Sequence, residues 1–329
     1  MNRTGSHAPV ALLTLLLLLL ASGNALASVA GAASLQIPPS ARFNGLGQSG
    51  VALADDATAA WWNPAGLGFM TGRTLGLMHS KLVPDLADDI YYEFAGWVQQ
   101  LEGWGTYSVN VIYLSYGTSV KTTDSPDPEG TFTSYEFSPS LSYGVRLDEN
   151  TAVGLGFKYV RVDLAPSGSV PDQGAGSGAG AGGSVAVDLG FLRHFGNYSA
   201  GLALTNFGPN ISFIDAEQSD PLPRFLRLGA AGLVYQGEYG HVLVSGDFNK
   251  LLVSGGQTTL NGGTELQYTD IMALRIGYMY DPDGHIEDFT FGGGFHKALG
   301  GKDFFFDYAN IPQADNLDRV HRFSFEMLF

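Results

Sequence analysis

Large apolar residues alternate with small or polar ones along many stretches after residue 72. Leu155, Phe157 and Tyr159, for example, are separated by Gly156 and Lys158. A period of two places neighbouring side chains on opposite faces of a β-strand. The pattern predicts fourteen strands, each near the length that a tilted membrane strand needs. They are Arg73–Val83, Asp89–Gln100, Gly103–Gly117, Thr133–Leu147, Thr151–Ala165, Gly182–His194, Asn197–Phe207, Pro223–Tyr235, Tyr239–Lys250, Gly256–Tyr268, Ile271–Asp281, Ile286–Lys297, Lys302–Asn310 and Asp318–Phe329.

The connections between these strands alternate in length. Tight turns follow even-numbered strands, and long connections follow the third, fifth and seventh. The tight turns include 101–102, 148–150, 195–196 and 236–238, and the long connections are 122–130, 166–181 and 208–222. Short periplasmic turns and longer outside loops give outer-membrane barrels this rhythm, which a soluble sandwich has no reason to keep. We therefore expect an all-β, antiparallel transmembrane β-barrel in the cell outer membrane, with periplasmic termini and extracellular long loops.

The N-terminus has the three parts of an export signal. Arg3 supplies a basic start, Val10–Ala21 is an apolar run rich in leucine, and Ala25-Leu26-Ala27 fits a cleavage site. A membrane-anchor helix is the alternative, but the apolar run is shorter than the roughly 20 residues that span a bilayer. Residues 1–27 are therefore predicted to be a cleaved signal peptide, with Ser28 as the first mature residue.

The composition narrows the class of the mature chain. Charged residues make up 15% of the sequence, against about 25% in soluble domains. The absence of cysteine removes lipoprotein acylation, disulfides, thiolate metal sites and cysteine catalysis. A net charge of −15 argues against a nucleic-acid partner.

The last predicted strand ends in an aromatic residue. Phe325, Met327 and Phe329 share one face of this strand, and Ser324 and Glu326 share the other. A terminal aromatic on an alternating last strand resembles the signal that the bacterial outer-membrane assembly machinery reads. The expected partners at this level are that machinery and the outer-membrane lipids.

Residues 28–72 do not follow the strand pattern. Asp55 or Asp56 is a candidate N-cap for a short helix that runs through Trp62. Pro64 should stop this helix, because the residue before proline avoids the α region. A compact segment rich in small residues would fit in the lumen as a hatch, and a periplasmic extension that plugs nothing is the alternative. The expected organisation is therefore a signal peptide over 1–27, a hatch over 28–72 and a barrel over 73–329.

A family resemblance lies in the same segment. The run Leu53–Leu67 contains Ala54-Asp55-Asp56-Ala57 and ends in Trp62, Asn63, Pro64, Ala65, Gly66 and Leu67. It resembles the start of the PorV/PorQ-type proteins, a branch of the superfamily that includes the FadL fatty-acid transporters. Further similar stretches are Leu222–Gly229, Gly262–Leu266, Ala273–Tyr278, Phe306–Ala309 and His321–Ser324. The resemblance implies a fourteen-stranded barrel with a hatch held around Asn63, Pro64 and Ala65.

The resemblance implies two alternative functions. PorV-like members act in type IX secretion, where they engage the C-terminal sorting domains of cargo and shuttle it from the translocon to a surface attachment complex. FadL-like members pass hydrophobic compounds through a hatch-gated lumen and a side portal. We favour the first. The second would need a kinked strand, for which Gly292, Gly293 and Gly294 are the candidates, although close packing of hatch backbone would also explain these glycines.

An enzyme is the third class of function. His321, Ser324 and Glu326 lie on one predicted strand, but period two places His321 on the opposite face from the other two. The remaining histidines have no clear metal-ligand spacing. Asp281 and Asp283 belong to acidic loops that could bind calcium or simply be solvated. We expect no catalytic residue, no cofactor and no metal site.

Overall fold

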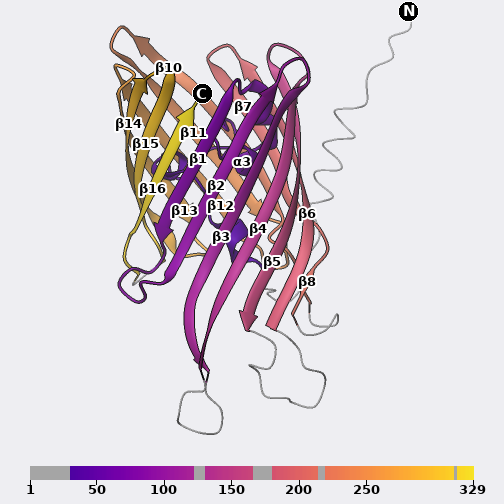
Figure 1. The fold of residues 1–329 in the computed structure, drawn as a ribbon. Helices are drawn as coiled ribbons and strands as arrows, with labels where there is room; N and C mark the ends of the chain where they lie inside the picture. The colour runs from indigo at the N-terminus through magenta and orange to yellow at the C-terminus, as the bar shows by residue number, and fades with distance from the viewer. Residues whose placement is uncertain (1–29, 122–129, 166–179, 214–218, 315–316) are drawn as a thin grey trace, which may run out of the picture.

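The computed structural model describes residues 30–121, 130–165, 180–213, 219–314 and 317–329, so the predicted signal peptide lies outside the described residues. Fourteen strands close into one antiparallel barrel (Figure 1) in which β1 pairs with β16. The predicted strand count and fold class are confirmed. The strands are β1 (Arg73–Lys81), β2 (Ile90–Leu101), β3 (Gly105–Lys121), β4 (Gly130–Arg146), β5 (Thr151–Ala165), β6 (Gly180–Phe195), β7 (Tyr198–Phe207), β10 (Phe225–Gly237), β11 (Gly240–Leu251), β12 (Thr258–Tyr268), β13 (Met272–Asp281), β14 (Ile286–Leu299), β15 (Lys302–Ile311) and β16 (Val320–Leu328).

Outside the barrel wall, the described chain forms four short helices and one small ladder. The helices are η1 (Ala33–Gln36), α2 (Ala41–Gly45), α3 (Ala59–Trp62) and η2 (Pro64–Phe69). The ladder pairs β8 (Ile211–Ser212) with β9 (Ser219–Asp220) inside the long connection after β7. The sequence did not predict it, because two residues are too few for a period to be visible. No helix of the described residues is long and apolar enough to cross a membrane.

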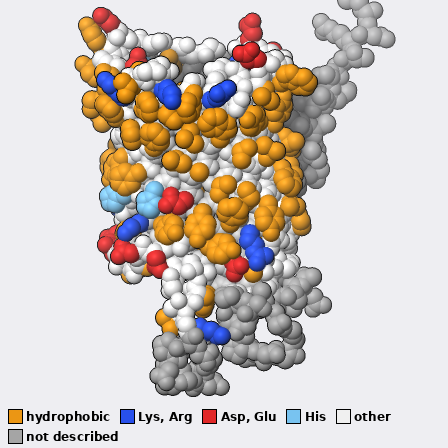
Figure 2. All heavy atoms as spheres, in the orientation of Figure 1, with side chains coloured by type: hydrophobic (Ala, Val, Ile, Leu, Met, Phe, Trp, Pro, Cys, Tyr) orange, Lys and Arg blue, Asp and Glu red, His pale blue; other side chains and the backbone are white. Residues whose placement is uncertain are grey.

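The two faces of the wall follow the predicted alternation. On β13, Leu274 is 61% exposed and points outward, whereas Arg275 is 7% exposed and points into the lumen. On β5, Phe157 is exposed and Lys158 is buried. Figure 2 shows hydrophobic side chains spread across the middle of the visible face of the wall. This is the surface that outer-membrane lipid would cover.

The barrel has a short-turn end and a long-loop end (Figure 1). The last strand finishes at the short-turn end, where the Phe329 N–H donates to the Arg73 carbonyl at 2.9 Å. The first described residues lie at the other end, since the Gly31 N–H donates to the Pro221 carbonyl at 3.0 Å. The start of β1 and the end of β16 therefore share one end of the barrel, as an even strand count requires. Residues 30–72 cross the lumen before β1, and the N-terminus itself lies outside the described residues.

Residues 30–72, which we call the hatch, fill the lumen. Phe43, Leu46, Trp61 and Trp62 are buried in one hydrophobic cluster with inward side chains of β1, β2 and β3, among them Phe94. A second cluster at the long-loop end joins residues of η1 to β5, β6 and the connection after β7; its buried members are Ala32, Leu35, Val160, Val162, Ala186, Ile211 and Leu222. The apolar area buried in these two clusters holds the hatch to the wall.

Candidate functional site

The Asn63-Pro64 step lies against the inner wall and is tied to it through one buried amide. Asn63 is 0% exposed, and its Nδ2 donates to the carbonyls of Val51 and Phe191 at 3.0 Å each. Its Oδ1 accepts the Ala65 N–H at 3.1 Å, so Asn63 caps η2, and Pro64 occupies the first turn. One side chain thus orients both the hatch loop around Val51 and the start of η2 against β6.

A row of glycines in the wall makes room for this step. Gly144, Gly154 and Gly190 are register neighbours on β4, β5 and β6. A Cβ atom on Gly154 would lie 2.2 Å from the Pro64 carbonyl carbon, and one on Gly190 would lie 2.2 Å from Asn63 Oδ1. Only glycine permits such close backbone approach. The hatch is therefore in direct contact with the wall along this row.

The predicted N-cap residues have other roles. The α3 helix begins at Ala59 with Thr58 as its N-cap, not Asp55 or Asp56. The Asp56 carboxylate instead accepts the Thr58 N–H at 2.7 Å and the Ser40 hydroxyl at 2.7 Å, which joins the two halves of the hatch. The sequence misplaced the cap because two further residues, Ala57 and Thr58, separate the acids from the helix.

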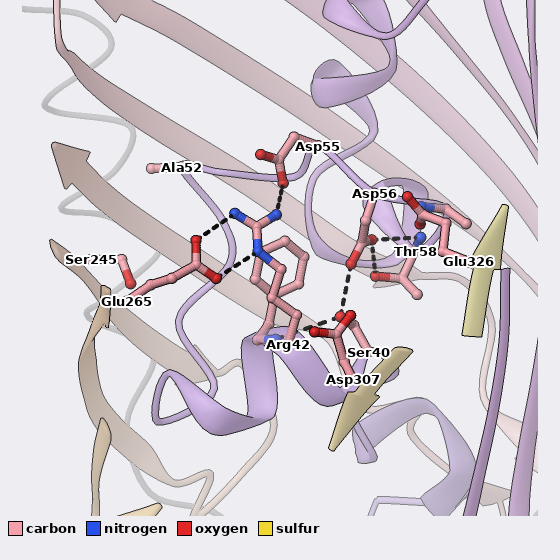
Figure 3. A network of polar contacts seen from close by, with 12 residues as sticks. Ser40, Arg42, Ala52, Asp55, Asp56, Thr58, Ser245, Glu265, Asp307 and Glu326 are labelled. Carbon is pink, nitrogen blue, oxygen red and sulfur yellow. Dashed lines mark hydrogen bonds and ion pairs between the residues drawn. The ribbon is translucent and has the colours of Figure 1, made fainter. Parts of the chain in front are cut away.

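Charged side chains form a network between α2 and the opposite wall (Figure 3). Arg42 donates to both oxygens of Glu265 on β12, through Nε at 3.0 Å and Nη2 at 3.2 Å, and through Nη1 to Asp55 at 2.7 Å. Arg275 on β13 donates to Glu265 and to Asp307 on β15, at 2.6 Å each. Glu265 thus accepts from two guanidinium groups and links the hatch to three strands.

Two hydrogen bonds from backbone N–H groups of the hatch connect it to side chains of β16. Glu326 accepts the Ala57 N–H at 2.7 Å, and the Ser324 hydroxyl oxygen accepts the Ala41 N–H at 2.7 Å. Asp56 lies beside Glu326 without a cation bound to either group (Figure 3). Burial, and then the neighbouring Asp55 carboxylate, hold the pKa of Asp56 above its ordinary value.

Two cavities flank the hatch at the short-turn end. One of about 550 Å³ contains the charged network and reaches Asp270 and Ile271 in the turn after β12. The other, of about 490 Å³, lies beside η2 and is lined by apolar groups that include Phe69, Met70 and Leu233. At the long-loop end, by contrast, η1 is fixed in place, because Glu136 accepts the N–H groups of Ala33 and Ser34.

No register shift interrupts the glycine run that was the candidate for a strand kink. β14 pairs without a register shift with β13 and β15 through Gly292, Gly293 and Gly294. A Cβ atom on Gly292 would lie 3.1 Å from the Gly45 Cα, so this glycine makes room for α2. Register shifts occur instead in β3, β5, β10 and between β6 and β7. Close packing of the hatch therefore explains Gly292, whereas Gly294 faces the side chains of Asp307 and Arg275 and Gly293 is not in close contact.

The predicted insertion residues lie on the outer face of β16. Phe323 is exposed. The Phe325 ring lies tilted against Phe306 with centroids 5.0 Å apart, and the Phe329 ring centroid lies 5.7 Å from that of Trp97. His321 bonds to Tyr308 on the same outer face, whereas Ser324 bonds to the hatch, so the two do not meet. No three His, Asp or Glu side chains gather as metal ligands among the described residues, which leave out parts of the acidic loops.

Sequence reasoning did not assign Arg42, Glu265, Arg275 and Asp307 to a site. For the last three, the available signal was a charged residue at an inward position of a lipid-spanning strand, where an unpaired charge is costly. Arg42 lies in the hatch, outside the strand pattern, and carries no such signal. Their partners, however, are more than 200 residues apart in the case of Arg42 and Glu265, and no period reveals such a pairing.

Comparisons with known proteins agree with the barrel and its hatch. No curated protein sequence matches the chain. The toluene transporter TbuX of Ralstonia pickettii is 14% identical with a TM-score of 0.58, and the match covers 87% of this chain and 97% of that one. The toluene transporter TodX of Pseudomonas putida is 16% identical with a TM-score of 0.53, covering 88% and 96%. A FadL homologue of Pseudomonas aeruginosa is 10% identical with a TM-score of 0.52, covering 94% and 99%.

These identities establish the fold and nothing finer. The sequence itself is matched over residues 23–258 by the family model described as type IX secretion system protein PorV. That range includes the whole hatch, with Asn63 and Pro64, and the wall through β11. The chain belongs to the PorV family of outer-membrane β-barrel proteins of the type IX secretion system.

Proposed function

We propose that this barrel serves type IX secretion as a closed, membrane-held docking and shuttle component. Its partners would be the translocon and the C-terminal sorting domains of cargo. Family membership supports the association with the secretion system. The docking role rests on one observation, which is that the hatch is fixed to the wall on opposite sides.

The two attachments support a lumen that stays closed. On one side, the backbone at Asn63 and Pro64 packs directly against the glycines of the wall. On the other side Arg42 and Glu265 form a two-bond ion pair in which Glu265 is 2% exposed. Breaking this partly buried pair would leave the buried Glu265 carboxylate with Arg275 as its remaining cationic partner, which disfavours release of the hatch. Because a hatch held in this way would keep the lumen closed, it supports a role in which the barrel binds partners on its surface.

Co-purification tests the proposal. The barrel, tagged on the chromosome and expressed at its native level, is cross-linked in intact cells and purified, and its partners are identified by mass spectrometry. We expect translocon components and sorting domains to be recovered. A matched control is an unrelated outer-membrane barrel of the same cell, tagged in the same way. Recovery of the barrel alone, or with the same proteins as the control, would contradict the docking role.

Transport of hydrophobic compounds is the second candidate, and one observation favours it. The cavity of about 490 Å³ beside η2 has Phe69, Met70 and Leu233 in its lining, and such apolar groups could contact a hydrophobic compound. The similar folds of the toluene transporters support the same reading at the level of architecture. Transport would also need the compound to leave the lumen. One irregularity in the wall is the register shift between β6 and β7. Asn206 fills it and forms hydrogen bonds with Asp188, Lys158 and the Pro223 carbonyl.

A further inference from the structure

Arg227 is a buried cation that lacks a polar partner. It lies on β10, points into the lumen and is 5% exposed. Among the described residues its side chain forms no hydrogen bond and no ion pair, and its Nε is buried without a partner. Buried charged groups are nearly always paired. The other buried charged side chains of the described chain, including Lys158, Arg275 and Arg322, all have polar partners.

Aromatic rings hold the guanidinium in place. Its Cζ lies 4.1 Å from the centroid of the Trp61 ring in the hatch and 4.7 Å from that of Phe225. A guanidinium on aromatic faces is stabilised through cation–π attraction. Stacking uses the faces of the guanidinium plane and leaves its N–H edges free to donate. The side chain is therefore oriented but not satisfied.

The nearby carboxylates are engaged elsewhere. Asp247 accepts the N–H groups of Gly50 and Val51 at 2.8 and 3.0 Å, and Asp188 pairs with Lys158 at 2.8 Å. The Oδ1 atom of Asp247 is also buried without a partner among the described residues. Neither carboxylate therefore forms a hydrogen bond with Arg227.

Arg227 lines a cavity of about 120 Å³ that is separate from the two at the short-turn end. Gln257 and Asp281 place this cavity at the long-loop end, and Asp281 is itself bonded to the Gly284 N–H. Amides and a hydroxyl contribute most of the remaining polar lining: Gln36, Gln48, Asn249, Thr259 and Asn261. A cavity of roughly 150 Å³ holds a molecule as large as benzene, so this one can take a small planar group.

We propose that this cavity is a carboxylate-binding site in which Arg227, fixed on Trp61 and Phe225, donates through its free N–H edge. A carboxylate matches the planar fork of guanidinium donors, and neutral amides around it would bind the polar atoms next to the carboxylate. The carboxylate could belong to the C-terminus of a peptide or to a small free acid. The inference is independent of the proposed role in secretion.

Tryptophan emission of the full-length protein in detergent tests the site, because Trp61 and Trp62 line the cavity. The probes are butyrate, a short peptide with a free C-terminus, the same peptide with an amidated C-terminus, and chloride at equal ionic strength. We expect a saturable change with butyrate or with the free peptide and none with chloride. Butyrate alone would identify a free acid as the source, and stronger binding of the free peptide over the amidated one would identify a chain terminus.

Variants separate a binding role from a structural one. Arg227→Met should weaken carboxylate binding at least tenfold and Arg227→Lys by less, whereas Arg224→Gln should leave it unchanged. Arg224→Gln is a matched control, because it also removes one positive charge at the long-loop end. The Arg224 side chain donates to the Gly208 carbonyl and to Asn210, and it does not line the cavity. Arg227→Met should still fold into a barrel that melts in one cooperative transition, since methionine keeps an apolar contact with Trp61 and Phe225. The absence of saturable binding by the wild type, or equal binding by wild type and Arg227→Met, would overturn the proposal.

Discussion

At the scale of single residues, glycine in the wall determines how close the hatch can lie. Gly154 and Gly293 are both in membrane strands, but a Cβ atom would lie 2.2 Å from the hatch at Gly154 and no closer than 3.8 Å to any neighbour at Gly293. We expect Gly154→Ala to lower the free energy of unfolding by about 1–3 kcal/mol, the usual cost of overpacking. Gly293→Ala should leave it nearly unchanged. Heat-dependent mobility of the folded barrel on gels measures both, and equal stability of the two variants would show that the hatch does not touch the row.

Asp56 gives a prediction for pH dependence. Because burial raises the pKa of Asp56, the folded protein holds this proton more tightly than the unfolded chain does. Stability is therefore lost as the pH rises through the folded pKa. We expect the melting midpoint of Asp56→Asn, relative to the wild type, to increase from acidic to neutral pH.

Asp148 is the matched control with the opposite sign. It lies in the exposed turn after β4, and the Asn150 N–H lowers its pKa. The stability that the Asp148 carboxylate contributes is present at neutral pH and is lost in acid. The melting midpoint of Asp148→Asn should therefore fall relative to that of the wild type as the pH rises. The same pH trend for both variants would refute the assignment of Asp56.

At the scale of elements, α2 is held to the wall through Arg42. We expect Arg42→Met to speed amide hydrogen exchange in residues 41–58 while the exchange of the barrel strands stays slow, because Glu265 keeps only Arg275 as its partner. Lys81→Met is the control, since its pair with Asp88 is exposed and contributes little. Unchanged exchange of α2 in Arg42→Met would show that the network does not hold the hatch.

The elements were largely predictable from the sequence, and their contacts were not. The period of two located the strands, since each outward residue such as Leu274 had to meet lipid and each inward one such as Arg275 had to find a partner. The Asn63-Pro64 step was recognised through its resemblance to a family. Its neighbours on β4, β5 and β6, however, are glycines that carry no periodic signal. Arg227 lies in Leu222–Gly229, one of the stretches similar to the family, yet its lack of a polar partner is visible only in the three-dimensional structure.

At the scale of the whole molecule, the hatch runs from the long-loop end to the short-turn end. If the long loops face outward, Ala30 lies at the cell surface and the turn containing Asn150 lies in the periplasm. The chain has no cysteine, so single cysteines report their positions cleanly. We expect Ala30→Cys, but not Asn150→Cys, to react with a membrane-impermeant maleimide in intact cells. Reaction of Asn150→Cys alone would reverse the orientation.

The most direct test of the closed, docking barrel is uptake of a hydrophobic compound by liposomes that contain the purified full-length protein. Radiolabelled toluene and a long-chain fatty acid are suitable compounds, and empty liposomes give the background. Because the hatch is attached through Asn63 on one side and Arg42 on the other, we expect uptake equal to background for both. Saturable uptake above background by the wild-type protein would contradict the account and favour transport.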